Sequence, residues 1–298
     1  MRTSLRTALA VIVAAATLSV GNSAGTTSAA NTVETTYSAA GPFATTTGTA
    51  TDSAGNTFAT YRPANYAALG FASPILTWGN GSNASPGQYS TLLTRLASYG
   101  FTIIASTLTN TGSGNEIDAG AGYLVAQNAV ASSIYFGHLD TTHVGAFGHS
   151  QGATGAVNAA THNPSRYRTV LTFSLPAQSW ASANSNCPTA AVCTPHPDQL
   201  TVPTFLIATH GQLDSIIASP ATETAYYNSI PGSASLGLIA ESADHNTIQN
   251  SGNPGIELGY ATAWLLYQLR GDTVAATAFS GTSPELPGNA NWPGSLTK

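Results

Sequence analysis

Short apolar runs along this chain alternate with amphipathic stretches, a pattern typical of strands that alternate with helices. The runs predicted to form strands are 74–78, 101–105, 142–147, 168–174, 203–208 and 236–240. The stretches predicted to form helices are 88–98, 116–131, 152–160, 221–229 and 255–270. Strands that are apolar on both sides and separated by helices form a mostly parallel sheet with both faces covered. The pattern therefore predicts an α/β fold.

The chain on either side of this alternation is more polar. Residues 43–61 are Thr-rich and alternate around a central turn, which predicts an antiparallel hairpin. Residues 31–38 are polar and expected to be loose, and the Gly- and Pro-rich tail 279–298 is expected to lie over the surface. Because no internal repeat or second core is evident, residues 31–298 are expected to form one domain.

The N-terminal segment has the features of a secretory signal peptide. Arg2 and Arg6 precede an apolar stretch over 7–20, and Ser28-Ala29-Ala30 is a suitable cleavage site. The stretch is too short to span a bilayer, and no cysteine follows it that could carry a lipid. We therefore expect residues 1–30 to be removed, and the protein to be extracellular without stable membrane insertion.

Charge is sparse in the rest of the chain. Only 7% of the residues are charged, and removing the leader leaves six basic and thirteen acidic residues, a formal net charge of −7. Without a basic patch, a nucleic-acid partner is not expected. A weakly charged surface suits a monomeric enzyme that meets uncharged or insoluble material.

The two cysteines, Cys187 and Cys193, are separated by five residues. In an exported protein this spacing predicts a disulfide that closes a short loop. Two cysteines without spaced histidines do not complete a metal site, so neither a metal nor another cofactor is expected.

The segment Gly148-His149-Ser150-Gln151-Gly152 matches the pattern G-x-S-x-G. It follows a predicted strand and precedes a predicted helix, which is the context of a nucleophile elbow. A chance match is the alternative in a chain rich in Gly and Ser, but the context favours Ser150 as a nucleophile. His149 is expected to be a packing and hydrogen-bonding residue.

A nucleophilic serine needs a base, and the base needs an orienting acid. In this type of fold the chain order is Ser, then Asp or Glu, then His. Asp214 follows the fifth predicted strand and His245 follows the last one, so they are predicted to be the acid and the base. The alternatives are that Asp214 only caps a helix and that His245 is a surface histidine. Asp244 ranks second as the acid, and His210 precedes Asp214 and would break the order.

Two backbone N–H groups are needed to hold the oxyanion of the tetrahedral intermediate. One is predicted to come from Gln151, the residue after the nucleophile. The other is predicted to come from the loop 78–83, with Ser82 as the first choice and Gly81 and Asn83 as neighbours.

Several segments together resemble a known family. They are Leu96-Ala97-Ser98-Tyr99-Gly100-Phe101, Gly148-His149-Ser150-Gln151-Gly152, Val202-Pro203-Thr204, Asp214-Ser215-Ile216 and His245. From about Phe43 to Arg270 the chain resembles the bacterial cutinase and polyester hydrolase group, which includes poly(ethylene terephthalate) hydrolases and is related to dienelactone hydrolases. The resemblance implies a single α/β-hydrolase domain without a large lid, no metal for the chemistry, and an open cleft lined by aromatic residues. It also implies that Trp180 either stacks on an aromatic acyl group or simply packs.

The chain departs from this family at the site. Gln151 stands where these enzymes usually carry Met, and Ser82 stands where they carry an aromatic residue that contacts substrate. The segment 180–202 is longer, and without a cysteine beyond Cys193 the usual C-terminal disulfide cannot form. These differences leave the substrate open while leaving ester hydrolysis intact.

The sequence thus predicts a secreted serine carboxylic-ester hydrolase similar to cutinases and polyesterases. Within the same chemistry, the alternatives are an esterase for small or polysaccharide-linked acetyl esters, or a lipase. A binding protein on an inactive hydrolase scaffold is a further alternative, which the ordered triad disfavours. A peptidase is disfavoured because the sequence offers neither a helical cap domain nor a charged pocket for a peptide terminus.

Overall fold

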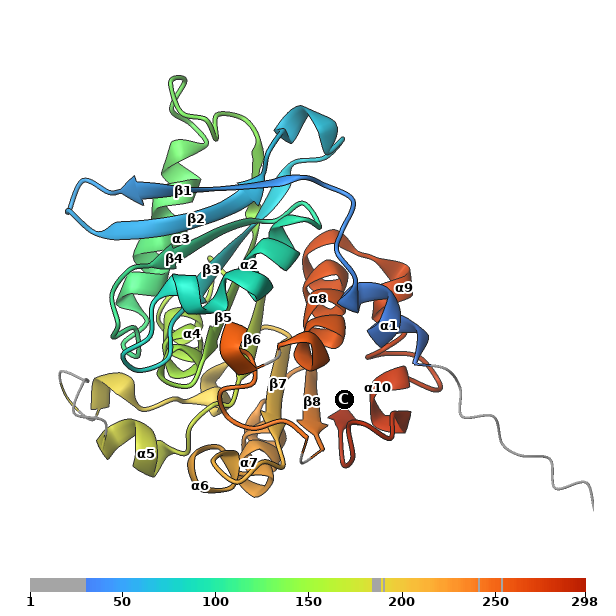
Figure 1. Cartoon of the computed structure of the whole chain (residues 1–298). Coiled ribbons are helices and arrows are strands. Elements are labelled where there is room, and N and C mark those ends of the chain that lie inside the picture. Colours follow the sequence, from blue (N-terminus) through green and yellow to red (C-terminus); the bar gives the residue numbers. More distant parts are fainter. Residues whose placement is uncertain (1–30, 184–188, 190, 241, 253) are drawn as a thin grey trace, which may run out of the picture. The chain divides into compact units, whose positions relative to one another are not determined.

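A twisted sheet of nine strands runs through the part of the chain that the computed structural model describes, which is 31–183, 189, 191–240, 242–252 and 254–298 (Figure 1). The strands are β1 (Thr45–Thr51), β2 (Thr57–Pro63), β3 (Ser73–Gly79), β4 (Thr102–Ser106), β5 (Leu139–His149), β6 (Thr169–Phe173), β7 (Thr204–Thr209), β8 (Ala234–Ile239) and β9 (Leu296–Thr297). Their order in the sheet is β1-β2-β4-β3-β5-β6-β7-β8-β9. The neighbouring pairs from β4 to β8 are parallel, whereas β1, β2 and β9 run antiparallel to their neighbours.

Helices cover both faces of this sheet. They are α1 (Thr32–Ser38), α2 (Ser90–Ala97), α3 (Asn115–Gln127), α4 (Gln151–His162), α5 (Gln178–Ala183), α6 (Asp214–Ile217), α7 (Pro220–Ser229), α8 (Gly255–Arg270), α9 (Thr273–Ala276) and α10 (Glu285–Gly288). Residues of α1, α2 and α8 share one hydrophobic cluster, and residues of α3, α4 and α7 share a second one on the other face. None of the helices in the described residues is long and apolar enough to cross a membrane.

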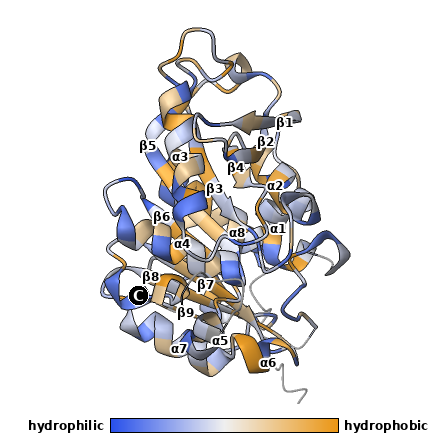
Figure 2. Ribbon diagram, turned by 90° about the vertical axis from the view of Figure 1, so that its left-hand side faces the viewer, coloured by the Kyte–Doolittle hydropathy of each residue, from blue (hydrophilic) through white to orange (hydrophobic). Residues whose placement is uncertain are grey.

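The continuous apolar runs of the parallel strands follow from this double covering. Successive side chains of a strand point to opposite faces, so a strand packed on both sides needs apolar residues at every position. In β3, Ile75 belongs to one cluster and Leu76 to the other, and both are fully buried. Figure 2 shows hydrophobic colours on central strands such as β7, and also on the short surface helix α6. The predicted α/β-hydrolase fold is confirmed.

Both ends of the described chain are more ordered than the sequence predicts. Residues 31–38 were expected to be loose, but they form α1, which packs on α8 through Val33 and Tyr37. These two apolar residues lie four positions apart, on one face of the helix, among polar neighbours that hide the pattern. The C-terminal tail was expected to lie over the surface, but it buries Leu286 and Trp292 and pairs β9 with β8.

The predicted hairpin is confirmed. Strands β1 and β2 pair from Thr45–Pro63 to Thr51–Thr57, and β2 then pairs with β4. The hairpin therefore extends the sheet at one side, away from the strands β5, β7 and β8 that lead to the predicted site residues.

Candidate active site

Ser150 occupies a strained turn between β5 and α4. Its φ of 53° and ψ of −123° place a residue with a side chain in a region that L-residues rarely adopt. A Cβ on Gly148 would collide with the carbonyl group of Gly152, and a Cβ on Gly152 would collide with that of Gly79. Both glycines are therefore required for the strand and the helix to approach closely enough to hold Ser150 at the turn.

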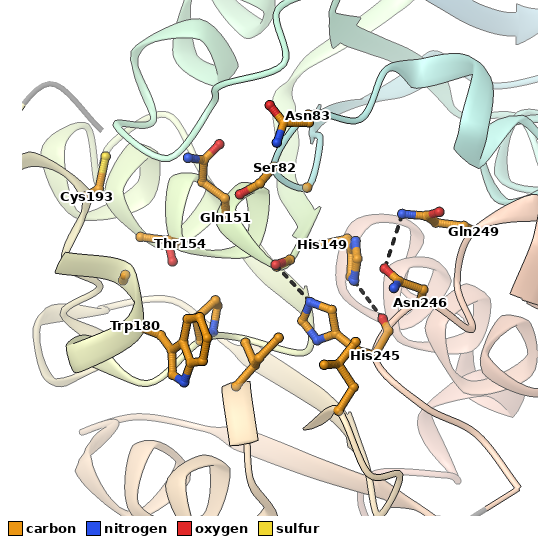
Figure 3. Close-up of a pocket in the computed structure, with 16 residues that line it drawn as sticks. Ser82, Asn83, His149, Gln151, Thr154, Trp180, Cys193, His245, Asn246 and Gln249 are labelled. Carbon is orange, nitrogen blue, oxygen red and sulfur yellow. Dashed lines mark hydrogen bonds between the residues drawn. The ribbon is translucent and has the colours of Figure 1, made fainter. Parts of the chain in front are cut away.

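The structure brings the three predicted residues of the triad together. His245 Nε2 lies 2.9 Å from Ser150 Oγ (Figure 3). On its other side, His245 Nδ1 lies 2.7 Å from Asp214 Oδ1. Ser150 follows β5, Asp214 follows β7 and His245 follows β8. They meet because parallel strands present their carboxyl ends at one edge of the sheet. Asp214 is fully buried and His245 is 6% exposed, so water competes little for this pair.

The hydrogen bonds of Asp214 determine which ring nitrogen of His245 carries the hydrogen. Asp214 Oδ2 accepts hydrogen bonds from Ser174 Oγ at 2.8 Å, from Thr209 N at 2.9 Å and from Thr209 Oγ1 at 2.8 Å. A carboxylate held by three donors accepts with its other oxygen as well, so Nδ1 of His245 carries the hydrogen. Nε2 is then the acceptor for the Ser150 hydroxyl, as a general base requires.

Ser174 and Thr209 were not predicted from the sequence. Thr209 is the last residue of β7, and Ser174 directly follows β6 with a φ of 52°. Their position at the carboxyl ends of two neighbouring strands could have indicated them. Ser and Thr are so common in this chain, however, that this position does not single them out.

Asp244, the second choice for the orienting acid, has a different role in the structure. Its Oδ1 accepts from the backbone N–H groups of Leu213 at 2.9 Å, Asp214 at 3.1 Å and His245 at 2.8 Å. Asp244 therefore ties the loop that carries the acid to the loop that carries the base. His210 faces the carbonyl of Pro293 at 3.4 Å instead.

The loop after β3 is held rigidly beside the elbow. The amide group of Asn80 donates to the carbonyls of Ser106 at 2.7 Å and Leu108 at 3.0 Å, and it accepts from Trp78 Nε1 at 2.9 Å. Asn80 is fully buried, so these bonds are shielded from water. A rigid loop at this place can present backbone N–H groups in a constant position.

The predicted oxyanion residues lie at the same cavity as the nucleophile. Ser82 and Asn83 line the cavity together with Ser150 and Gln151, and Figure 3 shows their side chains around one space. Gln151 begins α4, whose N-terminus carries partial positive charge. The side chain of Gln151 turns away, and its Oε1 accepts from Thr111 N at 3.3 Å. The geometry is compatible with the predicted donors, whose role remains a prediction.

An open cavity of about 510 Å³ surrounds Ser150. Its lining includes the apolar side chains of Trp180, Leu213 and Ile217 and the amides of Asn83, Asn246 and Gln249. The described lining residues include no Lys, Arg, Asp or Glu. An uncharged cavity favours an uncharged substrate, because a buried charge would have no partner there.

Trp180 lies at the rim of this cavity. It is 47% exposed, yet its Nε1 donates to the carbonyl of Ile216 on α6 at 2.8 Å. This bond holds the indole between α5 and α6, with the ring facing the cavity (Figure 3). Cys193 also lines the cavity and is buried. Its predicted partner Cys187 lies outside the described residues, so the disulfide remains a prediction.

Two buried glutamates lie behind the triad. Burial, and then the charge of Asp214, raises the pKa of Glu223 and of Glu257 well above the ordinary value. Glu223 Oε1 accepts from the backbone N–H of Leu175 at 2.8 Å, next to Ser174. Burial thus favours the neutral form of both carboxyl groups over the ionised form.

Glu257→Gln is expected to stabilise the protein increasingly as the pH rises. In the unfolded chain Glu257 ionises above its ordinary pKa of 4.5, whereas in the folded state it keeps its proton. The wild type therefore loses stability above that pH, and a neutral Gln does not. We expect the free energy of unfolding of Glu257→Gln, relative to that of the wild type, to increase by at least about 1 kcal/mol between pH 4.5 and pH 8. Urea unfolding of both proteins across this range measures it, and a difference independent of pH would contradict the burial argument.

The described residues contain no group of three His, Cys, Asp or Glu side chains that could hold a metal ion.

The fold and the geometry around Ser150 together define an α/β-hydrolase. A family model described as PET hydrolase-like matches residues 21–287. The chain therefore belongs to the PET hydrolase-like family and is an ester hydrolase of the α/β-hydrolase type. The resemblance predicted from the sequence is confirmed.

Proposed function

We propose that this protein is a secreted serine carboxylic-ester hydrolase that works through an acyl-enzyme on Ser150. The hydrogen-bonded chain from Ser150 through His245 to Asp214, at an uncharged open cavity, is the observation that carries the proposal. Secretion is proposed from the signal-peptide features of residues 1–30.

In the first half of the reaction, His245 Nε2 takes the proton of Ser150 as its Oγ attacks the ester carbonyl. The positive charge that develops on His245 is stabilised by Asp214, 2.7 Å from Nδ1. The backbone N–H groups of Gln151 and Ser82 hold the oxyanion of the tetrahedral intermediate. His245 then returns the proton to the departing alcohol, which leaves Ser150 acylated.

In the second half, water takes the place of the alcohol. His245 removes a proton from the water as it attacks the acyl carbon, and the proton returns to Ser150 Oγ when the acid is released. The same groups serve both halves, so the cavity needs no second catalytic site.

The apolar residues that line the cavity support an ester with an apolar or aromatic acyl group as the substrate, including polyesters. Trp180 offers a fixed aromatic face on which such a group can stack. The solvent-exposed rim, with Trp180 at 47% and Ile216 at 59%, leaves this face open to a large or insoluble substrate.

Esters of small or polysaccharide alcohols are the second candidate, supported by the amides that also line the cavity. Asn83, Asn246 and Gln249 can hydrogen-bond hydroxyl groups, which an aromatic polyester does not offer along its chain. Comparing rates on p-nitrophenyl acetate, longer acyl esters, acetylated xylan and polyester film separates the two candidates.

Labelling with a fluorophosphonate tests the mechanism directly. We expect one adduct per chain, located by peptide mass spectrometry on Ser150, because only an activated serine attacks the phosphorus at a useful rate. Heat-denatured protein and the variant Ser150→Ala provide the controls and should remain unlabelled. Absence of the adduct in the native protein would support a binding protein on an inactive scaffold.

A further inference from the structure

His149 is a buried histidine beside the nucleophile that the mechanism above does not use. It is 1% exposed and lies between two other groups of the site. Its Nε2 is 2.7 Å from the backbone carbonyl of His245, and its Nδ1 is 3.0 Å from Tyr89 Oη. Its ring also lies against the imidazole of His245, with 4.8 Å between the ring centroids. Figure 3 shows His149 beside His245, with a dashed line from its ring to the backbone carbonyl of His245.

The partners of His149 determine where its hydrogen lies. The carbonyl of His245 can only accept, so Nε2 of His149 donates. Burial, and then the neighbouring His245, lowers the pKa of His149 well below its ordinary value. The ring is therefore neutral, and its Nδ1 accepts from the hydroxyl of Tyr89. Burial raises the pKa of Tyr89 to about 12, so this hydroxyl keeps its hydrogen.

Tyr89, at the end of a short 3₁₀ helix over Pro86–Tyr89, continues the network to the other side of the site. Its Oη accepts from the backbone N–H of Gly81 at 3.2 Å, directly before Ser82. A Cβ on Gly81 would lie 2.9 Å from both Tyr89 Oη and His149 Nδ1, so the loop packs tightly on this pair. Tyr89 and the loop thus leave no room for a side chain between them.

The hydrogen bonds run in one direction through four residues. The N–H of Gly81 donates to Tyr89, the hydroxyl of Tyr89 donates to His149, and the Nε2–H of His149 donates to the carbonyl of His245. The chain joins the loop of the predicted oxyanion donor, the elbow and the loop of the base. Catalysis requires the positions of these three parts relative to one another to be held to within a fraction of an ångström.

We propose that His149 and Tyr89 are positioning residues that hold the loop of His245 and the loop of Gly81 and Ser82 in place against the nucleophile elbow. The inference rests on the proposed function, since it assigns these residues to the same reaction. His149 acts through the hydrogen bond that it donates, and not as a proton carrier or as a side chain that only fills space.

Three substitutions of His149 separate hydrogen bonding from packing. In His149→Gln the side-chain amide can still donate near the position of Nε2, whereas in His149→Phe the ring volume is kept and both hydrogen bonds are lost. His149→Asn reaches only the position of Nδ1. We expect kcat to fall about 3-fold for Gln and about 30-fold for Asn and Phe, with KM changed less than about 2-fold. If the ring only packs, Phe retains the most activity and the order is reversed.

Tyr89→Phe tests the other half of the network. It removes the acceptor of Gly81 N–H and the donor to His149, and we expect a loss of about 10-fold in kcat. Tyr66→Phe is the matched control, because Tyr66 is also a buried tyrosine whose hydroxyl bonds Thr102 Oγ1 at 2.8 Å, within the other hydrophobic cluster. It should retain the wild-type kcat.

A double-mutant cycle of Tyr89→Phe and His149→Phe shows whether the two act as one unit. The double variant should be impaired about as much as His149→Phe alone, because the first substitution already breaks the chain. Additive losses would overturn the proposal.

Active-site titration with a fluorophosphonate keeps the test independent of folding. Each rate is divided by the number of serines that can be labelled, so a fraction of unfolded variant does not lower the measured kcat. If the wild type is not labelled, the proposed function fails. If the wild type is labelled and turns over ester but His149→Phe and Tyr89→Phe match it per labelled site, the positioning role fails alone.

Discussion

Replacing Ser150 with Ala is expected to lower kcat for p-nitrophenyl butyrate by about 10⁵- to 10⁶-fold. The variant loses the only atom that can form the acyl-enzyme, and His245 is left without a nucleophile to activate. What remains is binding and oxyanion stabilisation, which accelerate attack by water only weakly. Initial rates at saturating ester, with the burst of p-nitrophenol recorded, measure both the loss and the absence of an acyl-enzyme.

The fold of Ser150→Ala should survive the change. Ala is as poorly suited as Ser to a φ of 53°, so the strain of the elbow is unchanged, and the free energy of unfolding should move by less than about 1 kcal/mol. Ser229→Ala is a matched control at the end of α7, where the hydroxyl bonds only within its own helix to the carbonyl of Tyr226. It should keep the wild-type kcat. A burst of p-nitrophenol in Ser150→Ala would refute the assignment of the nucleophile.

Asp214→Asn is expected to lower kcat about 10⁴-fold with little effect on KM. An amide cannot offer oxygen both to His245 and to the donors Ser174 and Thr209, which together face the two oxygens of Asp214. If the amide nitrogen turns toward His245, the imidazole must place its hydrogen on Nε2 and can no longer accept the proton of Ser150. If the nitrogen turns the other way, it meets three donors and the acid is destabilised.

Asp244→Asn provides the comparison for this prediction. Asn keeps one oxygen that can accept from the backbone N–H groups of Leu213, Asp214 and His245, which is what Asp244 does in the structure. We expect a loss of less than about 10-fold, because only loop positions change. If Asp244→Asn loses as much activity as Asp214→Asn in the same ester assay, Asp244 is the orienting acid and the assignment of Asp214 is wrong.

The raised pKa values of Glu223 and Glu257 agree with the assignment of Asp214 as the orienting acid. Each is fully buried and close enough to Asp214 for its charge to raise their pKa. If either one ionised, it would place a second negative charge beside the pair of Asp214 and His245. The raised pKa of both groups disfavours such a second charge.

Membership of the PET hydrolase-like family does not by itself specify the substrate, which depends on the residues that line the cavity. Gln151, at the position where the resemblance places Met, lines the cavity, and its Oε1 accepts from the backbone N–H of Thr111. The position usually held by an aromatic residue is Ser82, which is small and polar. The aromatic contact that remains is Trp180, held by Ile216. We propose that the balance between this ring and the amides of Asn83, Asn246 and Gln249 decides which esters are cleaved fastest.

The sequence by itself determined the class of fold and the family, and it predicted the residues that the structure brings together at the candidate site. The apolar runs could be recognised because a sheet covered on both faces requires them at every strand position, and the elbow because only glycine fits at Gly148 and Gly152. The fixed order of Ser150, Asp214 and His245 selected the acid and the base among several candidates, because each follows a strand whose carboxyl end lies at one edge.

Only the tertiary structure decided how these groups are held. Ser174, Asp244 and Tyr89 hydrogen-bond groups that are 30 to 60 residues away in the sequence, and such bonds leave no local pattern. Thr209 bonds Asp214, only five residues away, but a Thr at the end of a strand does not stand out in this chain. The helix α1 and the strand β9 were missed for a related reason, since α1 packs on α8 and the two-residue strand β9 pairs with β8, and both partners lie far away in the sequence. Local periodicity reports which face of a segment is apolar, whereas the partner that covers that face is set by how the whole chain folds.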